Sequence, residues 1–126
     1  MFDKYLIVDD SLRNLPDGSG FAFEARLGYY RGLGLSMVEE LAVTVDGEDI
    51  DRAAVRFHDG DDALTMDDME IAYDRRWEFG AKATISVVRP GGLAQGEHTL
   101  DLREKLRISY LPFPSFNSDS KTLSVR

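Results

Sequence analysis

The stretch EHTLDLREKLRISY, residues 97–110, decides the fold class of this chain. Apolar and polar side chains alternate along it, which is the period-two pattern of a strand with one buried face and one solvated face. Strands of this kind are typical of antiparallel sheets. The pattern predicts that one set of side chains faces the core: Leu100, Leu102, Leu106, Ile108 and Tyr110.

Two further stretches alternate in the same way. In WEFGAKATISVV, residues 77–88, the pattern predicts an inward face, as it does in FAFEARLGYY, residues 21–30. Residues 77–88 and 97–110 are expected to form one long hairpin, with Gly91 and Gly92 setting the turn between them. The expected inward residues are Trp77, Phe79, Ala81, Ala83, Ile85 and Val87 in the first stretch and Phe21, Phe23, Ala25, Leu27 and Tyr29 in the second.

A tight turn and a short helix are predicted in the middle of the chain. Asp46-Gly47 supplies the positive φ values of a type I′ turn, so residues 41–45 are expected to form a hairpin with a returning strand at 53–58, with Val55 and Phe57 inward. In TMDDMEIAYDRR, residues 65–76, Thr65 and Asp68 have the spacing of a helix capping box. The apolar residues Met66, Met69 and Tyr73 recur there at helical spacing.

These patterns define the fold class and the domain organisation. About eight strands in 126 residues predict an all-β fold, an antiparallel β-sandwich with at most one short helix. The chain has the size of a single domain, residues 1–126. A small barrel is the alternative, since alternation does not specify whether the sheets close.

Composition excludes several classes of partner. The net charge of −8 would repel phosphate backbones and anionic lipid, so we expect no nucleic acid and no membrane as partners. The chain has no cysteine, which excludes disulfides and thiolate metal sites. It shows no long apolar run and no secretory signal, and we expect a cytoplasmic protein.

Candidate groups for chemistry are few. The chain has two histidines, His58 and His98, and His98 lies on an inward register of its strand, where a structural role is favoured. The acidic run HDGDDALTMDDME, residues 58–70, places Asp59, Asp61 and Glu70 at positions of a calcium-loop template. The template fails at Leu64, where glycine is required, so a solvated acidic loop is favoured. The sequence therefore indicates no catalytic residue, no metal and no cofactor bound by this chain.

The stretch YLPFPSF, residues 110–116, begins a C-terminal tail, residues 111–126, that is expected to be extended. Pro112 and Pro114 forbid an ordinary central strand and favour a polyproline-like path. Leu111, Phe113 and Phe116 would then project from a stiff segment. They either plug the open end of the sandwich or dock on a partner, where rigid aromatic side chains lose little entropy on binding.

Three blocks of the sequence resemble the small β subunit of bacterial C-glycoside deglycosidases. They are RWEFGAKATISV (76–87), PGGLAQGEHTLDL (90–102) and LRISYLPF (106–113). The resemblance implies a heteromeric lyase in which a TIM-barrel α subunit carries the catalytic base and a divalent metal, manganese (Mn). Such an enzyme cleaves the carbon–carbon bond between sugar and aromatic aglycone, for example a flavonoid, in 3-oxo-C-glycosides.

For this chain, the resemblance implies an accessory subunit that is inactive alone and binds the α subunit. The hypothetical interface with that subunit consists of Arg107, Tyr110, Leu111, Pro112, Phe113, Pro114 and Phe116. Two other functions stay open. A carbohydrate-binding module would need exposed planar aromatics on one face, and a free-standing enzyme would need a carboxylate or His98 site.

Overall fold

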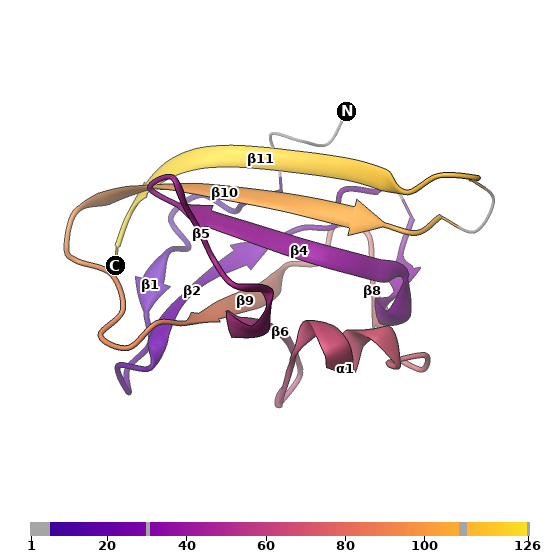
Figure 1. The fold of residues 1–126 in the computed structure, drawn as a ribbon, viewed down its shortest axis with the longest axis horizontal. Helices are drawn as coiled ribbons and strands as arrows, with labels where there is room; N and C mark the ends of the chain where they lie inside the picture. Colours follow the sequence, from indigo (N-terminus) through magenta and orange to yellow (C-terminus); the bar gives the residue numbers. More distant parts are fainter. Residues whose placement is uncertain (1–5, 30, 109–110, 126) are drawn as a thin grey trace.

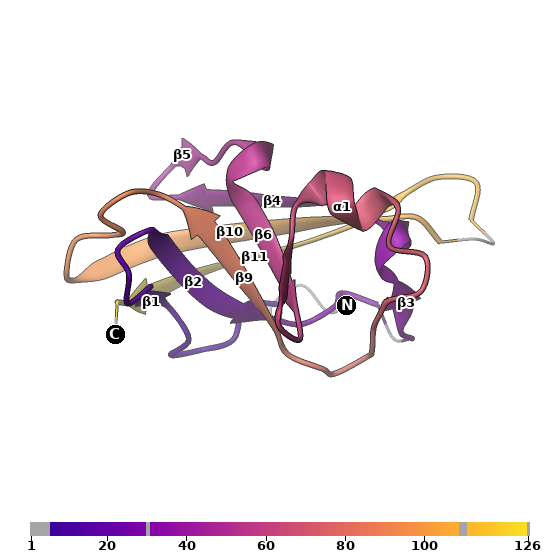
Figure 2. The same ribbon diagram turned by 90° about the horizontal axis from the view of Figure 1, so that it is seen from below.

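Two antiparallel sheets pack face to face in the computed structural model, which describes residues 6–29, 31–108 and 111–125 (Figure 1, Figure 2). Their inner faces share one apolar core. The prediction of an all-β antiparallel sandwich is confirmed, and the α-helix found in these ranges, α1 (Met66–Glu70), has 5 residues. No helix in the described ranges has the length and apolar character needed to cross a membrane.

The first sheet has four strands in the order β11-β10-β4-β5. β10 pairs with β11 along its whole length, from Glu97 opposite Ser124 to Leu106 opposite Ser115. Its other side pairs with β4. The bounds are β4 (Val38–Val45), β5 (Glu48–Asp49), β10 (Glu97–Leu106) and β11 (Ser115–Ser124).

The second sheet has five strands in the order β1-β2-β9-β6-β7. The chain before β1 extends the same edge, since Ile7 forms a bridge with Ala25. The backbone N–H of Ile7 also donates to the Asp119 carboxylate on β11 (2.9 Å), which ties the two sheets together along one side. The bounds are β1 (Arg13–Asn14), β2 (Gly20–Ala25), β6 (Val55–Asp59), β7 (Asp62–Leu64) and β9 (Ala83–Val88).

Short elements close one end of the sandwich. The strands β3 (Leu33–Gly34) and β8 (Arg76–Trp77) pair with each other, and two 3₁₀ turns are present, η2 (Leu35–Met37) and η3 (Arg52–Ala54). The predicted capping box of α1 is confirmed. Thr65 Oγ1 accepts from Asp68 N, and Asp68 Oδ2 accepts from Thr65 N, both at 3.0 Å.

The inner faces follow the predicted alternation. Because successive side chains of a strand point to opposite faces, each strand contributes every second residue to the core. The alternation correctly placed a large set of residues that are at most 3% exposed: Phe21, Phe23, Leu27, Val55, Phe57, Ile85, Val87, Leu100, Leu102, Leu106 and Ile108.

The predicted long hairpin between residues 77–88 and 97–110 is wrong, because β9 and β10 belong to different sheets. The segment between them crosses from one sheet to the other. Gly91 and Gly92 do set a turn, with φ of 86° and 67°, and Gly92 N donates to Arg89 O (2.8 Å). A tight turn fits a crossover as well as a hairpin, so turn chemistry did not distinguish the two.

The predicted returning strand at residues 53–58 is also misassigned. The turn itself is confirmed, with φ of 51° at Asp46 and 82° at Gly47. The strand that returns beside β4 is the two-residue β5. The chain then crosses to the second sheet, where β6 pairs with β9 and β7, still with Val55 and Phe57 inward.

The tail contains a ten-residue strand, β11, that the sequence did not reveal. Its inner positions include the polar residues Asn117, Asp119 and Lys121, so the apolar alternation is missing. Two of these side chains bond to the N-terminal segment instead: Asp119 accepts from Ile7 N (2.9 Å), and Lys121 Nζ donates to Asp9 Oδ1 (3.0 Å). Removing the tail would therefore remove an edge strand along with the segment at 111–114.

Two residues predicted to face inward, Phe79 and Ala81, are exposed. Trp77 is in the core as predicted, but Phe79 is 53% exposed. A turn interrupts the expected strand there, with φ of 80° at Gly80 and a bond from Ala81 N to Glu78 O (3.1 Å). Tyr73 is 75% exposed, because α1 ends at Glu70 and the helical spacing does not continue.

Candidate functional site

One end of the sandwich is formed by loops that are far apart in the sequence. η2 lies between two of them, since Leu35 N donates to Arg75 O and Arg107 N donates to Met37 O, both at 2.8 Å. The loop after α1 and the connection from β10 to β11 therefore lie on either side of η2, at the end where Figure 1 shows α1 and β8. We call this region the docking end.

The docking end gathers most of the exposed apolar side chains of the described residues. Of the six large hydrophobic residues that are exposed, four lie on its loops or at the start of β11, and a fifth, Phe79, lies in the turn that follows β8. Monomeric proteins seldom expose a large contiguous apolar patch, and such a patch usually marks an association surface. The five are Ile71, Tyr73, Phe79, Phe113 and Phe116.

The structure places the residues of the hypothetical interface in different environments. Leu111 is half-buried, packs against the core, and its N–H donates to Ile108 O (2.9 Å). Pro112, Phe113 and Phe116 are exposed, and Pro114 is half-buried. Arg107 is exposed, with Nη2 at 3.5 Å from Ser36 O. Tyr110 lies outside the described residues.

Sequence reasoning missed Ile71, Tyr73 and Phe79 at this end. The first two were missed because residues 65–76 were read as a helix candidate, whereas α1 ends at Glu70 and both residues follow it. Gly80 was the available signal for Phe79, since a glycine with positive φ commonly ends a strand.

Ion pairs of Arg75 and Arg76 lie beside the loop after α1. The Arg75 guanidinium bonds to the carboxylates of Asp62 (2.7 Å) and Asp59 (2.8 Å), and these bonds raise its pKa. Arg76 Nε bonds to Glu78 Oε1 (2.9 Å). An apolar centre with a charged rim is the usual anatomy of a protein–protein interface.

A buried carboxylate fixes the chain beside the docking end. Glu104 is on the inner face of β10 and has no exposed surface. Its Oε1 accepts from Gly28 N (2.7 Å), which attaches the segment after β2 to the first sheet. A Cβ at Gly28 would lie 2.8 Å from Asn117 Cβ and 3.0 Å from Glu104 Oε1.

We expect Gly28→Ala to destabilise the fold by about 1–3 kcal/mol, the usual cost of overpacking a well-filled site. Urea unfolding followed by circular dichroism measures this change. Gly34→Ala is the matched control, because its Cβ would meet nothing closer than 3.8 Å. Equal effects of the two substitutions would contradict the steric account.

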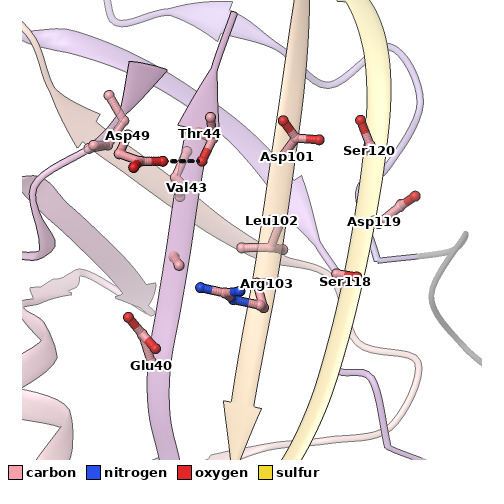
Figure 3. A pocket seen from close by; sticks show the side chains of 12 residues that line it. Glu40, Val43, Thr44, Asp49, Asp101, Leu102, Arg103, Ser118, Asp119 and Ser120 are labelled. Atoms are coloured by element: carbon pink, nitrogen blue, oxygen red, sulfur yellow. Dashed lines mark hydrogen bonds between the residues drawn. The ribbon is translucent and has the colours of Figure 1, made fainter. Parts of the chain in front are cut away.

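A shallow groove of about 700 Å³ runs along the outer face of the first sheet (Figure 3). Asp101 and Arg103 lie in it side by side, with Glu40 and Asp49 nearby, and Thr44 Oγ1 donates to Asp49 Oδ1 (3.0 Å). Its lining residues include no aromatic ring. A sugar ring would find hydrogen-bonding groups but no stacking surface, so the groove gives little support to a carbohydrate-binding module.

Both histidines are engaged in hydrogen bonds within the chain. His58 Nε2 lies 2.7 Å from Ser86 Oγ, a hydroxyl on a residue that is itself buried. His98 contacts Ala94 O (2.7 Å) and Asp46 Oδ2 (2.6 Å), so it joins the β4–β5 turn to the start of β10. The bond to Ala94 O and the bond to Asp46 raise the pKa of His98, and the His98 bond lowers the pKa of Asp46.

These shifts predict how His98 contributes to stability at different pH. A raised pKa means that the charge-dependent contribution is complete below the usual value of 6.5 and is lost as the pH rises through the raised value. The lowered pKa of Asp46 keeps its contribution present until the pH falls below 3.8. We therefore expect His98→Gln to lower the Tm more at pH 6 than at pH 9. An equal or larger loss at pH 9 would contradict this assignment.

The acidic run does not form a calcium loop. Arg75 donates hydrogen bonds to the carboxylates of Asp59 and Asp62. On the outside of α1, Arg52 Nη2 donates to Glu70 Oε1 (3.1 Å). Over residues 6–29, 31–108 and 111–125, no group of three or more histidines and carboxylates is placed to hold a metal ion. In these ranges we therefore take the docking end as the candidate functional site, because its large apolar side chains are exposed.

The fold is a small antiparallel β-sandwich that exposes large apolar side chains at the docking end. The family model described as C-glycoside deglycosidase beta subunit matches residues 2–110, and the chain belongs to this family. The match includes Arg107 and stops before Leu111.

Two relatives align with most of the chain. The 3'-dehydrocarminate deglycosidase beta subunit of Microbacterium sp. is 40% identical over 113 residues, which cover 89% of this chain and 83% of the relative. The C-glycoside deglycosidase beta subunit of Eubacterium cellulosolvens is 32% identical over 114 residues, covering 87% and 78%.

Proposed function

We propose that this chain is the small β subunit of a heteromeric C-glycoside deglycosidase, a carbon–carbon lyase that acts on 3-oxo-C-glycosides in the bacterial cytoplasm. Membership of the beta-subunit family supports the subunit role. A 3'-dehydro sugar conjugate in the name of one relative supports an oxidised sugar as the substrate class. The partner is a TIM-barrel α subunit that carries the catalytic base and a divalent metal, manganese.

The chemistry of such an enzyme requires a catalytic base and a bound metal ion. The carbon that links aglycone to sugar has no lone pair to protonate, so the acid catalysis of glycosidases does not apply. A ketone at C3 instead acidifies the C2 proton of the sugar. A base removes that proton, and the aglycone leaves from C1 by elimination.

The described residues of this chain do not offer a site for the divalent metal. No group of three or more histidines and carboxylates among them is placed to bind an ion. Its two histidines already serve internal hydrogen bonds. We propose that the chain's role in the complex is to bind and stabilise the α subunit.

The gathering of exposed apolar side chains at one end carries this proposal. The α subunit covers the docking end, with Phe113 and Tyr73 as its main anchors and Ile71, Phe79 and Phe116 around them. Aromatic residues of this kind supply much of the binding energy at interfaces. Arg107, exposed beside them, pairs with a carboxylate of the α subunit.

Co-expression with a sugar-isomerase-like α subunit tests the proposal. We expect the two chains to purify together and to release aglycone from a 3-oxo-C-glycoside, and this chain alone to release none. Co-purification without cleavage would support the association and reject the substrate class. Turnover by this chain alone would reject the accessory role.

A further inference from the structure

Two stretches of this acidic chain contain no acidic residue, and they meet at the docking end. Residues 25–38 and 105–118 include no aspartate or glutamate, whereas the whole chain has a net charge of −8. The backbone joins the two stretches beside η2, because Arg107 N donates to Met37 O (2.8 Å). The positive charges of both stretches therefore lie in neighbouring parts of the fold. The basic residues are Arg26, Arg31, Lys105 and Arg107.

Three acidic side chains at the edges of these stretches each lie beside a basic residue. Glu39 is 3.6 Å from Lys105 Nζ, and Glu40 is opposite Lys105 in the pairing of β4 with β10. Glu78, which lies beside the first stretch, accepts a hydrogen bond from Arg76 Nε (2.9 Å). The charge of Lys105 is therefore balanced within the chain, and these carboxylates do not reach Arg107.

Arg107 is exposed and, within the described part of the chain, forms no ion pair with a carboxylate. Its side chain has a long contact to a carbonyl oxygen, with Nη2 at 3.5 Å from Ser36 O. Its backbone is fixed by the bond to Met37, and Phe113, which is 61% exposed, follows in the same connection. A guanidinium is the group that proteins favour for ion pairs with carboxylates at interfaces, because its planar N–H groups match the two oxygens.

We propose that the α-subunit surface that covers η2 and the connection from β10 to β11 is acidic, with one carboxylate that pairs with Arg107 through two hydrogen bonds. This inference rests on the proposed function, since it concerns the surface of that partner. A basic or purely apolar surface at this place would bury the guanidinium without a counter-charge, which is strongly unfavourable. An acidic surface satisfies the guanidinium and leaves the apolar contacts to Phe113.

The other side of the docking end has a different charge pattern, which orients the α subunit. In the loop after α1, Asp74 is exposed. The neighbouring Arg75 is already bonded to Asp59 and Asp62. An α-subunit carboxylate placed there would meet negative charge instead of an unpaired guanidinium. Because like charges across an interface disfavour a wrong arrangement, the acidic surface selects the side formed by η2.

Calorimetric titration of the α subunit at about 50 mM and about 500 mM NaCl tests the acidic surface. Arg107→Glu should weaken binding at least about 10-fold more than Arg103→Glu at the lower salt concentration. Arg103 is the matched control, because it is also exposed, lies in the groove on the outer face of β10, and gives the same change in net charge (Figure 3). The excess effect of Arg107→Glu should shrink at the higher concentration, since salt screens charges at the rim of an interface.

Arg107→Lys keeps the charge but loses the two parallel hydrogen bonds, so its Kd should lie between those of the parent chain and Arg107→Glu. Equal Kd values for Arg107→Glu and Arg103→Glu would overturn the proposal. Tighter binding of Arg107→Glu than of the parent would also overturn it, because that result is expected for a basic α-subunit surface. Failure of the parent to bind the α subunit at either salt concentration would instead reject the proposed function, and this inference with it.

Discussion

Replacing Phe113 with serine should weaken binding to the α subunit about 10- to 100-fold and leave the chain folded. The ring is 61% exposed, so its loss removes little from the core. Aromatic anchors at interfaces typically contribute more than about 1–2 kcal/mol, and each 1.4 kcal/mol is about a tenfold change in Kd. Tyr73→Ser should act in the same direction, because this side chain is exposed on the neighbouring loop.

Calorimetric titration of the α subunit with each variant measures the effect, and thermal unfolding verifies that the variants are folded. Val88→Ser is the matched control, since Val88 is 49% exposed at the end of β9 away from the docking end. We expect its Kd to equal that of the parent chain. Parental affinity in both Phe113→Ser and Tyr73→Ser would remove these residues from the interface, as would an equal loss in the control.

Trp77→Ala should cost about 3–5 kcal/mol of unfolding free energy, the usual effect of removing a large buried aromatic side chain. Trp77 is 2% exposed, its ring packs edge-on against Phe57 with centroids 5.0 Å apart, and its Nε1 donates to Ala81 O (3.0 Å). Domains of this size are stable by only about 5–15 kcal/mol, so most of the margin would be lost.

Phe79→Ala is the matched control for this prediction, because Phe79 is also aromatic, lies two residues away and is exposed. Its cost should be within about 0.5 kcal/mol, as for most surface substitutions. Urea unfolding of both variants provides the comparison. A similar loss in the two variants would mean that Trp77 does not support the core as the structure indicates.

The same two residues show what sequence could and could not predict about the fold. Alternation identified the buried face at Trp77, Ile85 and Val87, because burial is periodic in a strand. It failed at Phe79, because the turn at Gly80 interrupts the strand. The assignment of β9 and β10 to different sheets depends on packing between distant strands, which local turn residues do not encode.

The strand β11 could not be predicted from the sequence because its inner face is largely polar. In β11, Asp119 binds the Ile7 backbone and Lys121 binds Asp9, so burial there is satisfied by hydrogen bonds and gives no apolar alternation. The candidate site was predicted in part. The stiffness and apolarity of residues 111–116 indicated an association surface, whereas Ile71 and Tyr73 join it only because α1 stops after Glu70.

Hydrogen–deuterium exchange of this chain with and without the α subunit tests the docking end most directly. We expect slower exchange in the complex at residues 71–75 and 111–116, with little change at the β4–β5 turn around Asp46 at the opposite end. Unchanged exchange in both loops, with protection elsewhere on the sandwich, would contradict the account.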